Sequence, residues 1–255
     1  MRRLAAIAAP VVFVILLLAG WEVACRALAV PSYRLPTPSD IAVAAVQNLP
    51  LLASSAWNTL STALLALVWA SVFACALALV VAINPLIERA VQPVVTTLQV
   101  TPIVAIAPLV TIWAGLDHPE RAILVLAVVV AFFPIFSGAL TGLKSADPDL
   151  ERLFDLYGAS RLQRLLRLRL PSAVPFLLEG HKVAAGLALV GAVVAEFVAG
   201  SGGAQGLAWR ILEAQHRLET AKMFGALVVL AAMGVALYAA MQAAEQAILR
   251  RWRGR

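Results

Sequence analysis

Long apolar segments recur along this chain, and they limit its possible folds more than any other feature. Charged residues make up 13% of the 255 residues, about half of the ~25% share that is usual in globular proteins. A helix needs about 20 consecutive apolar residues to cross a bilayer, and six segments are long enough. The sequence therefore predicts an all-α integral membrane protein with about six transmembrane helices. The predicted spans are residues 7–29, 58–83, 91–116, 121–143, 181–200 and 223–248.

The third of these segments contains Pro93, Pro102 and Pro108. Proline lacks a backbone N–H and its ring clashes with the preceding turn of a helix. We therefore expect residues 91–116 to be kinked or partly broken. Whether the segment forms a full span stays open at this point.

The distribution of basic residues predicts the orientation of the spans. With the N-terminus inside, fourteen of the twenty Lys and Arg residues fall in inner loops and tails. An excess of positive charge marks the cytoplasmic side, which predicts that both termini lie inside (N-in, C-in). The outer loops at 31–40 and 201–222 are short, and the second has room for one surface helix. Neither is large enough to form a domain that captures a solute.

The longest polar stretch faces inward and is predicted to form a hairpin of two short helices at about 144–175. Asp147 is placed to cap the first helix, with Pro148 at its first position. Gly158 interrupts the helical pattern, and Ser160 with Gln163 forms a capping box for a second helix.

The two prolines after the second helix, Pro171 and Pro175, are expected to end that helix and turn the chain. Three interpretations of the basic hairpin remain open. It is an interfacial helix that meets anionic lipid, a docking element for a soluble partner, or a gate in a self-sufficient channel. The glycine between two capped helices favours a partner of defined shape. The hairpin's arginines are Arg161, Arg164, Arg167 and Arg169.

The spacing within the hairpin resembles a known signature. Gly158 is followed after nine residues by the sequence LRLP at 168–171, which is similar to the cytoplasmic loop of the permease subunits of binding-protein-dependent ABC importers. The likeness is strongest to the subgroup that serves nitrate, sulfonates, taurine and thiamine precursors. Further stretches follow the same pattern, namely NTLSTAL (58–64), GHKVAAGLALVGAVVAEFVAG (180–200), GLAW (206–209) and RRW (250–252).

The resemblance implies a multi-pass protein of the bacterial plasma (inner) membrane with a type I ABC importer permease fold, in which the hairpin is the coupling element for a cytoplasmic ATPase. It implies residues 1–56 as an N-terminal span and outer connector, 57–248 as the permease domain, and 249–255 as a basic cytoplasmic tail. The implied partners are two copies of an ATP-binding subunit, an extracytoplasmic solute-binding protein, a second permease copy in a homodimer, and membrane lipid, without nucleic acid. The implied coupling residues are Tyr157, Gly158, Ala159, Ser160, Arg161, Gln163, Arg164, Leu170 and Pro171.

One part of the signature is missing. The family's E-A-A positions, counted from Gly158, hold Arg152, Leu153 and Phe154, and Glu151 stands one residue early. This departure leaves open the contact that the acidic residue makes with the ATPase.

Energy coupling is expected to come from outside the chain. The phosphate-binding pattern GxxxxGK[ST] does not occur in the sequence, so we expect no cofactor here, ATP being used by the partner subunit. We also expect no metal site and no catalytic residues. An ATP-independent secondary transporter or channel is the alternative, and it would require an internal repeat or membrane-embedded charge pairs. An intramembrane enzyme would require a catalytic dyad or a metal-ligand pair.

Polar residues inside the predicted spans are candidates for the translocation path, because polar groups in hydrocarbon are costly. These candidates are Gln99, Thr101 and Glu196, and helix pairing is the competing role for each. Small residues at four-residue spacing in the fifth span, such as Ala184, Ala188 and Ala192, predict close helix packing. The transported solute is expected to be a small anion or organic solute such as nitrate, a sulfonate, taurine or a thiamine precursor.

Overall fold

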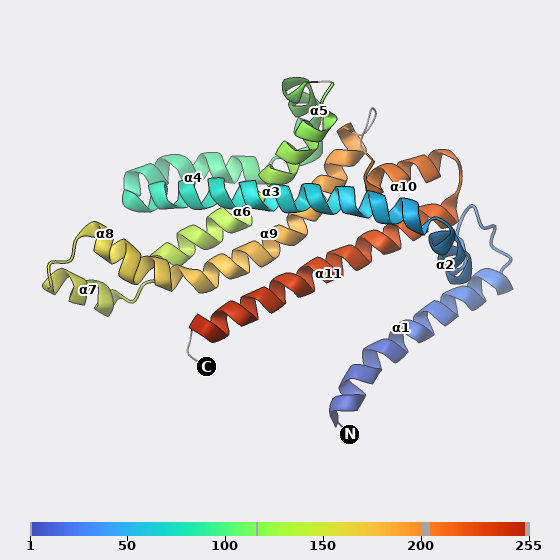
Figure 1. Cartoon of the computed structure of the whole chain (residues 1–255), viewed down its shortest axis with the longest axis horizontal. Coiled ribbons are helices and arrows are strands. Elements are labelled where there is room, and N and C mark those ends of the chain that lie inside the picture. Colours follow the sequence, from blue (N-terminus) through green and yellow to red (C-terminus); the bar gives the residue numbers. More distant parts are fainter. Residues whose placement is uncertain (1, 116, 200–204, 253–255) are drawn as a thin grey trace. The chain divides into compact units, whose positions relative to one another are not determined.

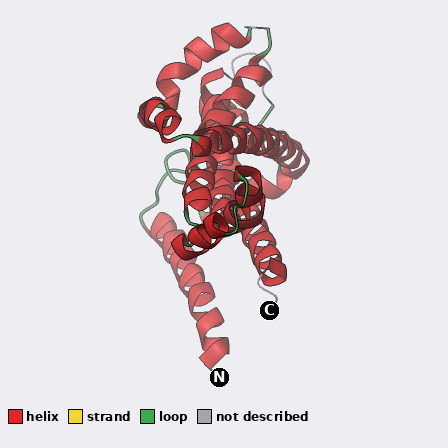
Figure 2. Ribbon diagram, turned by 90° about the vertical axis from the view of Figure 1, so that its left-hand side faces the viewer, coloured by secondary structure: helices red, strands yellow, loops and turns green. Residues whose placement is uncertain are grey.

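All regular elements in the described part of the chain are helices, as the sequence predicts (Figure 2). The computed structural model describes residues 2–115, 117–199 and 205–252. The helices in these ranges are α1 (Arg2–Ala27), α2 (Pro38–Gln47), α3 (Leu49–Ile83), α4 (Pro85–Val100), α5 (Ile103–Ala114), α6 (Pro119–Lys144), α7 (Pro148–Leu156), α8 (Arg161–Arg164), the π-helical segment η1 (Leu165–Arg169), α9 (Leu170–Ala199), α10 (Leu207–His216) and α11 (Thr220–Trp252).

The chain divides into two compact units, each described by itself. The first comprises Met1–Trp57 and Gln205–Ala232, and the second comprises Asn58–Ala204 and Met233–Arg255. The second unit contains the bent pair α4 and α5, the long helices α6 and α9, and the predicted hairpin (Figure 1).

Four helical stretches are long and apolar enough to cross a membrane. They are Leu49–Ile83, Pro119–Lys144, Arg161–Val198 and Thr220–Trp252, and the pair α4 and α5 makes a fifth if it counts as one span. The predicted first span, residues 7–29, forms most of α1. Several side chains at the start of α1 lie outside the described part of the chain, so a sixth crossing stays a prediction.

The third predicted span is broken, and the break lies at Pro102. Helices α4 and α5 meet at an angle of 100°. Thr101 has an extended backbone with φ −72° and ψ 124°, because the ring of a following proline disfavours the helical region for the residue before it. Pro93 and Pro108 lie inside their helices without ending them. The predicted kink is therefore confirmed, and one of the three prolines causes it.

The predicted end of the hairpin at Pro171 and Pro175 is wrong. The chain stays helical from Arg161 to Val198. Within η1 the N–H of Leu170 donates to the carbonyl of Leu165, five residues back. This wider turn shifts the hydrogen-bond register just before Pro171, so the missing N–H of that residue does not end the helix. Pro175 lies inside α9.

Helices α6 and α9 pack closely because small residues face each other. A Cβ atom added to Gly138 would lie 2.7 Å from the carbonyl oxygen of Phe176, and one added to Gly180 would lie 2.7 Å from that of Pro134. Even a methyl side chain would not fit at either glycine, so the backbones of α6 and α9 are in direct contact. The predicted packing stripe of the fifth span is confirmed, since Ala184, Ala188 and Ala192 are all buried.

In helix α3 the distribution of buried and exposed side chains is the opposite of that in a helix of a soluble protein. Its buried stripe consists of small residues, and its large apolar side chains are exposed, which is the arrangement expected of a helix that faces lipid. The buried residues include Ala66, Ala70 and Ala74, and the exposed ones include Trp69 and Phe73.

Helix α2 lies in a region that the sequence led us to expect as a plain connector. Thr37 caps the helix with a capping box to Asp40, and Pro38 takes its first position. The carboxylate of Glu22 in α1 accepts hydrogen bonds from the backbone N–H (3.1 Å) and hydroxyl (2.8 Å) of Ser39. The pattern of Thr37, Pro38 and Asp40 is a standard helix start, so the signal was present in the sequence.

Candidate functional site

The first helix of the hairpin, α7, begins as predicted. The side chain of Asp147 accepts a hydrogen bond from the N–H of Asp149 at 2.8 Å. Pro148 occupies the first turn, and Asp149 and Glu151 lie near the positive end of the helix dipole. These local interactions fix where α7 starts and which way it leaves α6.

A glycine turn joins the two helices of the hairpin. Gly158 has φ +63°, a left-handed conformation that costs other L-residues energy and that commonly ends helices. Its N–H donates to the carbonyl of Asp155 at 3.0 Å, and the N–H of Ala159 donates to that of Phe154 at 2.9 Å. The turn therefore closes α7 with two backbone hydrogen bonds.

The second helix of the hairpin also starts as predicted. Ser160 and Gln163 form the full capping box, in which the Gln163 side chain accepts from the N–H of Ser160 at 2.8 Å and the Ser160 hydroxyl accepts from the N–H of Gln163 at 3.2 Å. Because α8, η1 and α9 are continuous, this cap starts a helix that runs directly into a membrane span.

Charged side chains tie the two helices of the hairpin together. The carboxylate of Glu151 lies 2.7 Å from Nε of Arg169 and 3.5 Å from Nη1 of Arg164. Arg164 also pairs with Asp155. We call Glu151, Asp155, Arg164 and Arg169 the hairpin staple. Two of the four arginines that the sequence offered to a partner are therefore used inside the hairpin.

The missing acidic residue of the signature has a structural explanation. Arg152, at the position of the signature's glutamate, is exposed and pairs with Asp149 at 3.1 Å. Glu151 points instead to Arg169, eighteen residues further along the chain. The one-residue shift thus moves the carboxylate from the hairpin surface into the staple.

We expect Glu151→Gln to loosen the hairpin. The change removes the charge shared by Arg164 and Arg169, which are partly shielded from solvent. A partly buried pair of this kind is worth about 1 kcal/mol, or about fivefold in local opening. Hydrogen exchange of residues 148–169 measures the effect. Asp149→Asn removes an exposed pair and is the matched control, so equal exchange in both variants would contradict the staple.

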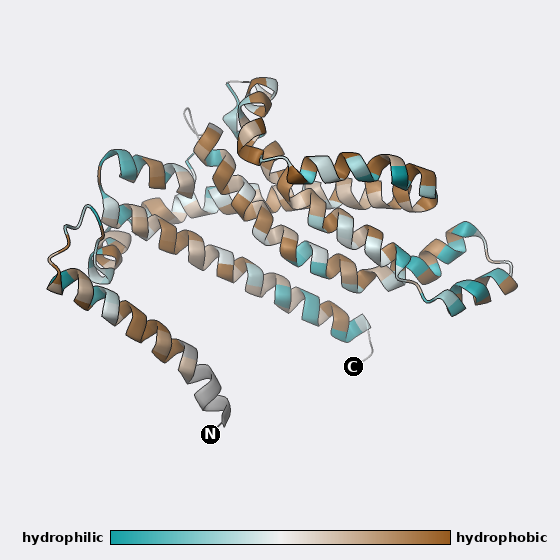
Figure 3. Ribbon diagram, turned by 180° about the vertical axis from the view of Figure 1, so that it is seen from behind, coloured by the Kyte–Doolittle hydropathy of each residue, from teal (hydrophilic) through white to brown (hydrophobic). Residues whose placement is uncertain are grey.

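The tip of the hairpin exposes large apolar side chains. Leu156 is 85% exposed, Tyr157 is 83% exposed and Leu162 is 63% exposed. Along the rest of the hairpin hydrophilic and hydrophobic residues are mixed (Figure 3), and Leu150, Leu153 and Leu166 there are less exposed than Leu156 and Tyr157. A shallow pocket of about 310 Å³ lies beside the tip, and it is lined by Leu153, Phe154, Tyr157, Ala159, Gln163 and Arg167.

The structure separates the predicted coupling residues into two groups. Residues 157–164 gather at the glycine turn and the start of α8, where Arg161 is exposed. Leu170 and Pro171 lie at the start of α9, partly buried and away from the turn. The predicted set therefore lies at two places in the chain, the glycine turn and the start of α9, and its contact with an ATPase stays a prediction.

The three predicted path residues lie in different surroundings. Glu196 is buried, and its Oε1 accepts a hydrogen bond from the hydroxyl of Thr59 at 2.8 Å, which links α9 to α3. The hydroxyl of Thr101 donates to the carbonyl of Thr97 within α4 at 2.7 Å. Gln99 alone of the three lines a described cavity.

That cavity lies between α4 and α6 and has a volume of about 220 Å³. Five lining residues share one face of α4, with the spacing i, i+4, i+7, i+8 and i+11. They are Glu88, Gln92, Val95, Thr96 and Gln99.

The α6 side of the cavity has the same helical periodicity. Its lining residues are Phe133, Phe136, Ser137, Leu140, Thr141 and Lys144. Glu88 and Lys144 form an ion pair at one end. Sequence inspection missed this cavity, although the polar face of α4 was visible in the spacing of Gln92, Thr96 and Gln99.

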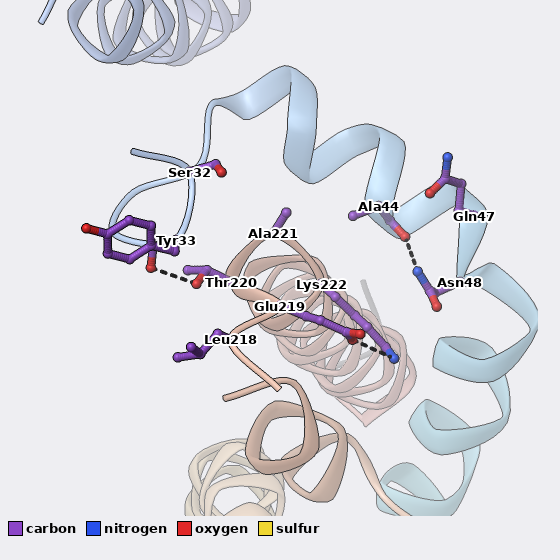
Figure 4. A pocket seen from close by; sticks show the side chains of 10 residues that line it. All are labelled: Ser32, Tyr33, Ala44, Gln47, Asn48, Leu218, Glu219, Thr220, Ala221 and Lys222. Atoms are coloured by element: carbon purple, nitrogen blue, oxygen red, sulfur yellow. Dashed lines mark hydrogen bonds and ion pairs between the residues drawn. The ribbon is translucent and has the colours of Figure 1, made fainter. Parts of the chain in front are cut away.

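A second polar pocket lies in the first unit and has a volume of about 420 Å³. Figure 4 shows how its wall is held: the Thr220 hydroxyl donates to the carbonyl of Tyr33 at 2.8 Å, and Lys222 pairs with Glu219 at 3.2 Å. Its lining residues belong to the predicted outer loops and the helices beside them.

The short helix predicted in the outer loop is confirmed as α10, in which Leu207, Ala208 and Ala214 are buried; its place at the outer surface stays a prediction. Arg210 of α10 donates to the hydroxyl of Ser55 at 3.0 Å and pairs with Glu213 at 2.8 Å. The hydrogen bond from Arg210 holds the pKa of the Glu213 carboxyl below its usual range. Within the described residues, no group of three His, Cys, Asp or Glu side chains is arranged to hold a metal ion.

Comparison with protein families gives one match that covers most of the chain. The model described as "Binding-protein-dependent transport system inner membrane component" matches residues 70–254. This range includes the hairpin, the α4–α6 cavity and Glu196.

Several characterised or named relatives align along nearly the whole chain. The formylaminopyrimidine transport permease protein ThiX of Halalkalibacterium halodurans is 30% identical over 96% of this chain and 95% of its own length. The riboflavin transport system permease protein RibX of Chloroflexus aurantiacus is 32% identical over 94% and 88%. The taurine transport system permease protein TauC of Escherichia coli is 27% identical over 94% and 87%.

A solved structure shares the fold. The structure titled "Crystal structure of an amino acid ABC transporter with histidines" superimposes with a TM-score of 0.66, covering 81% of this chain and 96% of that one, at 15% sequence identity.

Proposed function

Because the chain belongs to the family of binding-protein-dependent transport system inner membrane components, we propose that its α7–α8 hairpin couples an ATPase to the membrane spans. The chain is a multi-pass inner-membrane protein and the permease subunit of an ABC importer. Permeases of this kind work with ATP-binding and substrate-binding proteins. The details of that assembly for this chain are proposals.

The exposed tip of the hairpin is the observation that carries the coupling proposal. Leu156 and Tyr157 are among the most exposed large apolar side chains in the described chain. Large apolar side chains that are this exposed at the tip of a hairpin favour a protein partner over water, and the neighbouring pocket offers a place for a partner's side chain. We propose that residues 157–163 form the ATPase-facing surface, and that Arg161, which is exposed and has no ion pair among the described residues, is its cation.

The continuous helix beyond the tip supplies a way to transmit motion. Helical structure runs from Arg161 to Val198, so a displacement of the tip moves a membrane span as a rigid body. Leu170 and Pro171 would act within this helix and not in the ATPase contact. Arg164 would hold the hairpin's shape through the staple.

The assembly that we propose is a homodimer of the permease with two ATPase subunits at the inner face. ATP would be bound by those subunits, and a solute-binding protein would dock at the outer face. Gln99 would line the solute path, and Glu196 would pair helices α3 and α9 through Thr59. Lipid headgroups would meet the exposed arginines of the hairpin. The transported solute is proposed to be a small molecule of the kinds that the relatives' names give.

A charge placed at the tip tests the coupling proposal. Tyr157→Asp is expected to abolish co-purification of the ATPase with the permease and to lower ATP-driven uptake by more than tenfold, because it puts a carboxylate in an apolar contact. Tyr33→Asp is the matched control, since Tyr33 is also exposed but lies in the predicted outer connector. Retention of the ATPase by Tyr157→Asp would contradict the assignment.

A further inference from the structure

The polar faces of α4 and α6 have hydrogen-bonding capacity that the chain does not use. In the described residues, no hydrogen bond or ion pair engages the side chains of Gln92, Thr96, Gln99, Ser137 or Thr141, and all five are exposed. Both helices belong to apolar stretches of span length. Polar groups at that depth are costly unless they face a water-filled passage or another polar surface.

The arrangement of these groups forms a track. Glu88 and Gln99 are eleven residues apart on one face of α4, which is about 16 Å along the helix axis. The track begins at the ion pair of Glu88 with Lys144 and ends beside the bend at Pro102. Such a track suits a solute that moves along the span and is held by hydrogen bonds at several levels.

The charge balance of the cavity argues against an anionic solute. Among the described lining residues, Lys144 is the one cation, and it is neutralised by Glu88. Anion pathways use unpaired Lys or Arg side chains. A sulfonate or nitrate ion would find amides, hydroxyls and a carboxylate here, without a compensating positive charge.

The remaining chemistry fits a flat nitrogen ring. Phe133 is partly exposed and lines the cavity, whereas Phe136 beside it is buried and stacks on Phe132 with ring centroids 5.7 Å apart. Phe133 is therefore the ring that can offer a face to a solute. Aromatic faces stack well on heterocycles, with ~1–3 kcal/mol per ring. The side-chain amide of glutamine can donate one hydrogen bond and accept another side by side. This pattern matches a ring nitrogen, which accepts, next to an amino group, which donates. A volume of about 220 Å³ admits one such ring.

We propose that the α4–α6 cavity is a binding subsite on the solute path, selective for uncharged amino-substituted nitrogen rings of the aminopyrimidine class over sulfonate and nitrate anions. This inference rests on the proposed function, because it takes the cavity to be part of an importer's path. It adds a substrate class and names the groups that select it: Gln92 and Gln99 for the ring's edge, Thr96 and Thr141 for further hydrogen bonds, and Phe133 for the ring's face.

Direct binding to the full-length permease in lipid nanodiscs tests the proposal. The probe is tritiated 4-amino-5-hydroxymethyl-2-methylpyrimidine, and the competitors are methanesulfonate and nitrate. We expect saturable binding of the probe that neither anion displaces. Absence of saturable binding to the wild type, or displacement by methanesulfonate at the probe's own concentration, would overturn the proposal.

Two neighbouring threonines provide a matched pair of variants. Thr96→Val and Thr141→Val remove hydroxyls that line the cavity, and each is expected to weaken probe binding about three- to tenfold, the value of one hydrogen bond. Thr97→Val makes the same change beside the cavity, where the hydroxyl donates to the carbonyl of Pro93, and is expected to leave binding unchanged. An equal loss in Thr96→Val and Thr97→Val would count against the subsite.

A charge variant tests the exclusion of anions. Glu88→Gln leaves Lys144 unpaired in the cavity, so methanesulfonate is expected to begin to displace the probe. No displacement in this variant would contradict the role assigned to charge balance. Because no ATPase takes part in these measurements, a negative result leaves the coupling proposal intact. Conversely, retention of the ATPase by Tyr157→Asp would refute the coupling proposal without changing the binding expected here.

Discussion

Gly158→Pro is expected to abolish ATP-driven uptake while the chain still inserts in the membrane. Gly158 has φ +63°, whereas proline is fixed near φ −65°. The substitution also removes the N–H that donates to the carbonyl of Asp155. The glycine turn therefore has to open, and the two helices of the hairpin lose their relative orientation.

Insertion is expected to survive because Gly158 lies between helices and contacts no span: a Cβ atom added to it would meet nothing within 4 Å. Uptake into proteoliposomes and co-purification of the ATPase measure the loss, which we expect to exceed a hundredfold for uptake. Gly158→Asn is the matched control, since asparagine tolerates positive φ far better than other residues. Wild-type uptake by the proline variant would refute the coupling role of the turn.

Features set by local interactions were predictable from the sequence. The caps at Asp147 and Ser160 depend on side chains within three residues of the helix start, so their patterns can be read directly. The bend at Pro102 depends on the steric effect of proline on the residue before it, which is also local. The same logic applies to Thr37 and Asp40 at the start of α2, a signal that was present and overlooked.

Features set by contacts between distant residues were not predictable in this way. Nothing near Glu151 in the sequence indicates that it pairs with Arg169, because the pairing depends on the angle between α7 and η1. Pro171 was expected to end a helix, and the π turn before it reversed that outcome. To predict the α4–α6 cavity, one would have to know which faces of the two helices meet. The spacing of Gln92, Thr96 and Gln99 could have indicated a polar face on α4, but not the helix that it faces.

For the hairpin, the family signature indicated a feature that local patterns alone would not have shown. The spacing from Gly158 to Pro171 marks a segment that does form two capped helices joined by a glycine turn, yet it groups residues that the structure separates. Most of the turn residues 157–163 are exposed at the tip, whereas Leu170 and Pro171 belong to the helix that continues into the span. A signature of this kind does not say which of its residues would contact a partner.

Gly180→Ala is expected to destabilise the permease strongly, although it adds a single methyl group. The new Cβ atom would lie 2.7 Å from the carbonyl oxygen of Pro134 and 3.4 Å from Cα of Ile135. Both are backbone atoms of α6, so the clash cannot be relieved by a side-chain rotation. Overpacking of a close contact costs ~1–3 kcal/mol, and here the upper end applies because two long helices would have to move apart.

The same substitution six residues along α9 provides the control. A Cβ atom at Gly186 would meet nothing within 4 Å, so Gly186→Ala is expected to be neutral or slightly stabilising, since alanine has the higher helix propensity. Thermal stability in detergent, followed by size-exclusion chromatography after heating, compares the two variants. We expect a lower Tm for Gly180→Ala alone. Equal stability of the two would mean that the α6 and α9 backbones are not in contact, and the helix that links the hairpin to the membrane would then lack the rigid support that coupling requires.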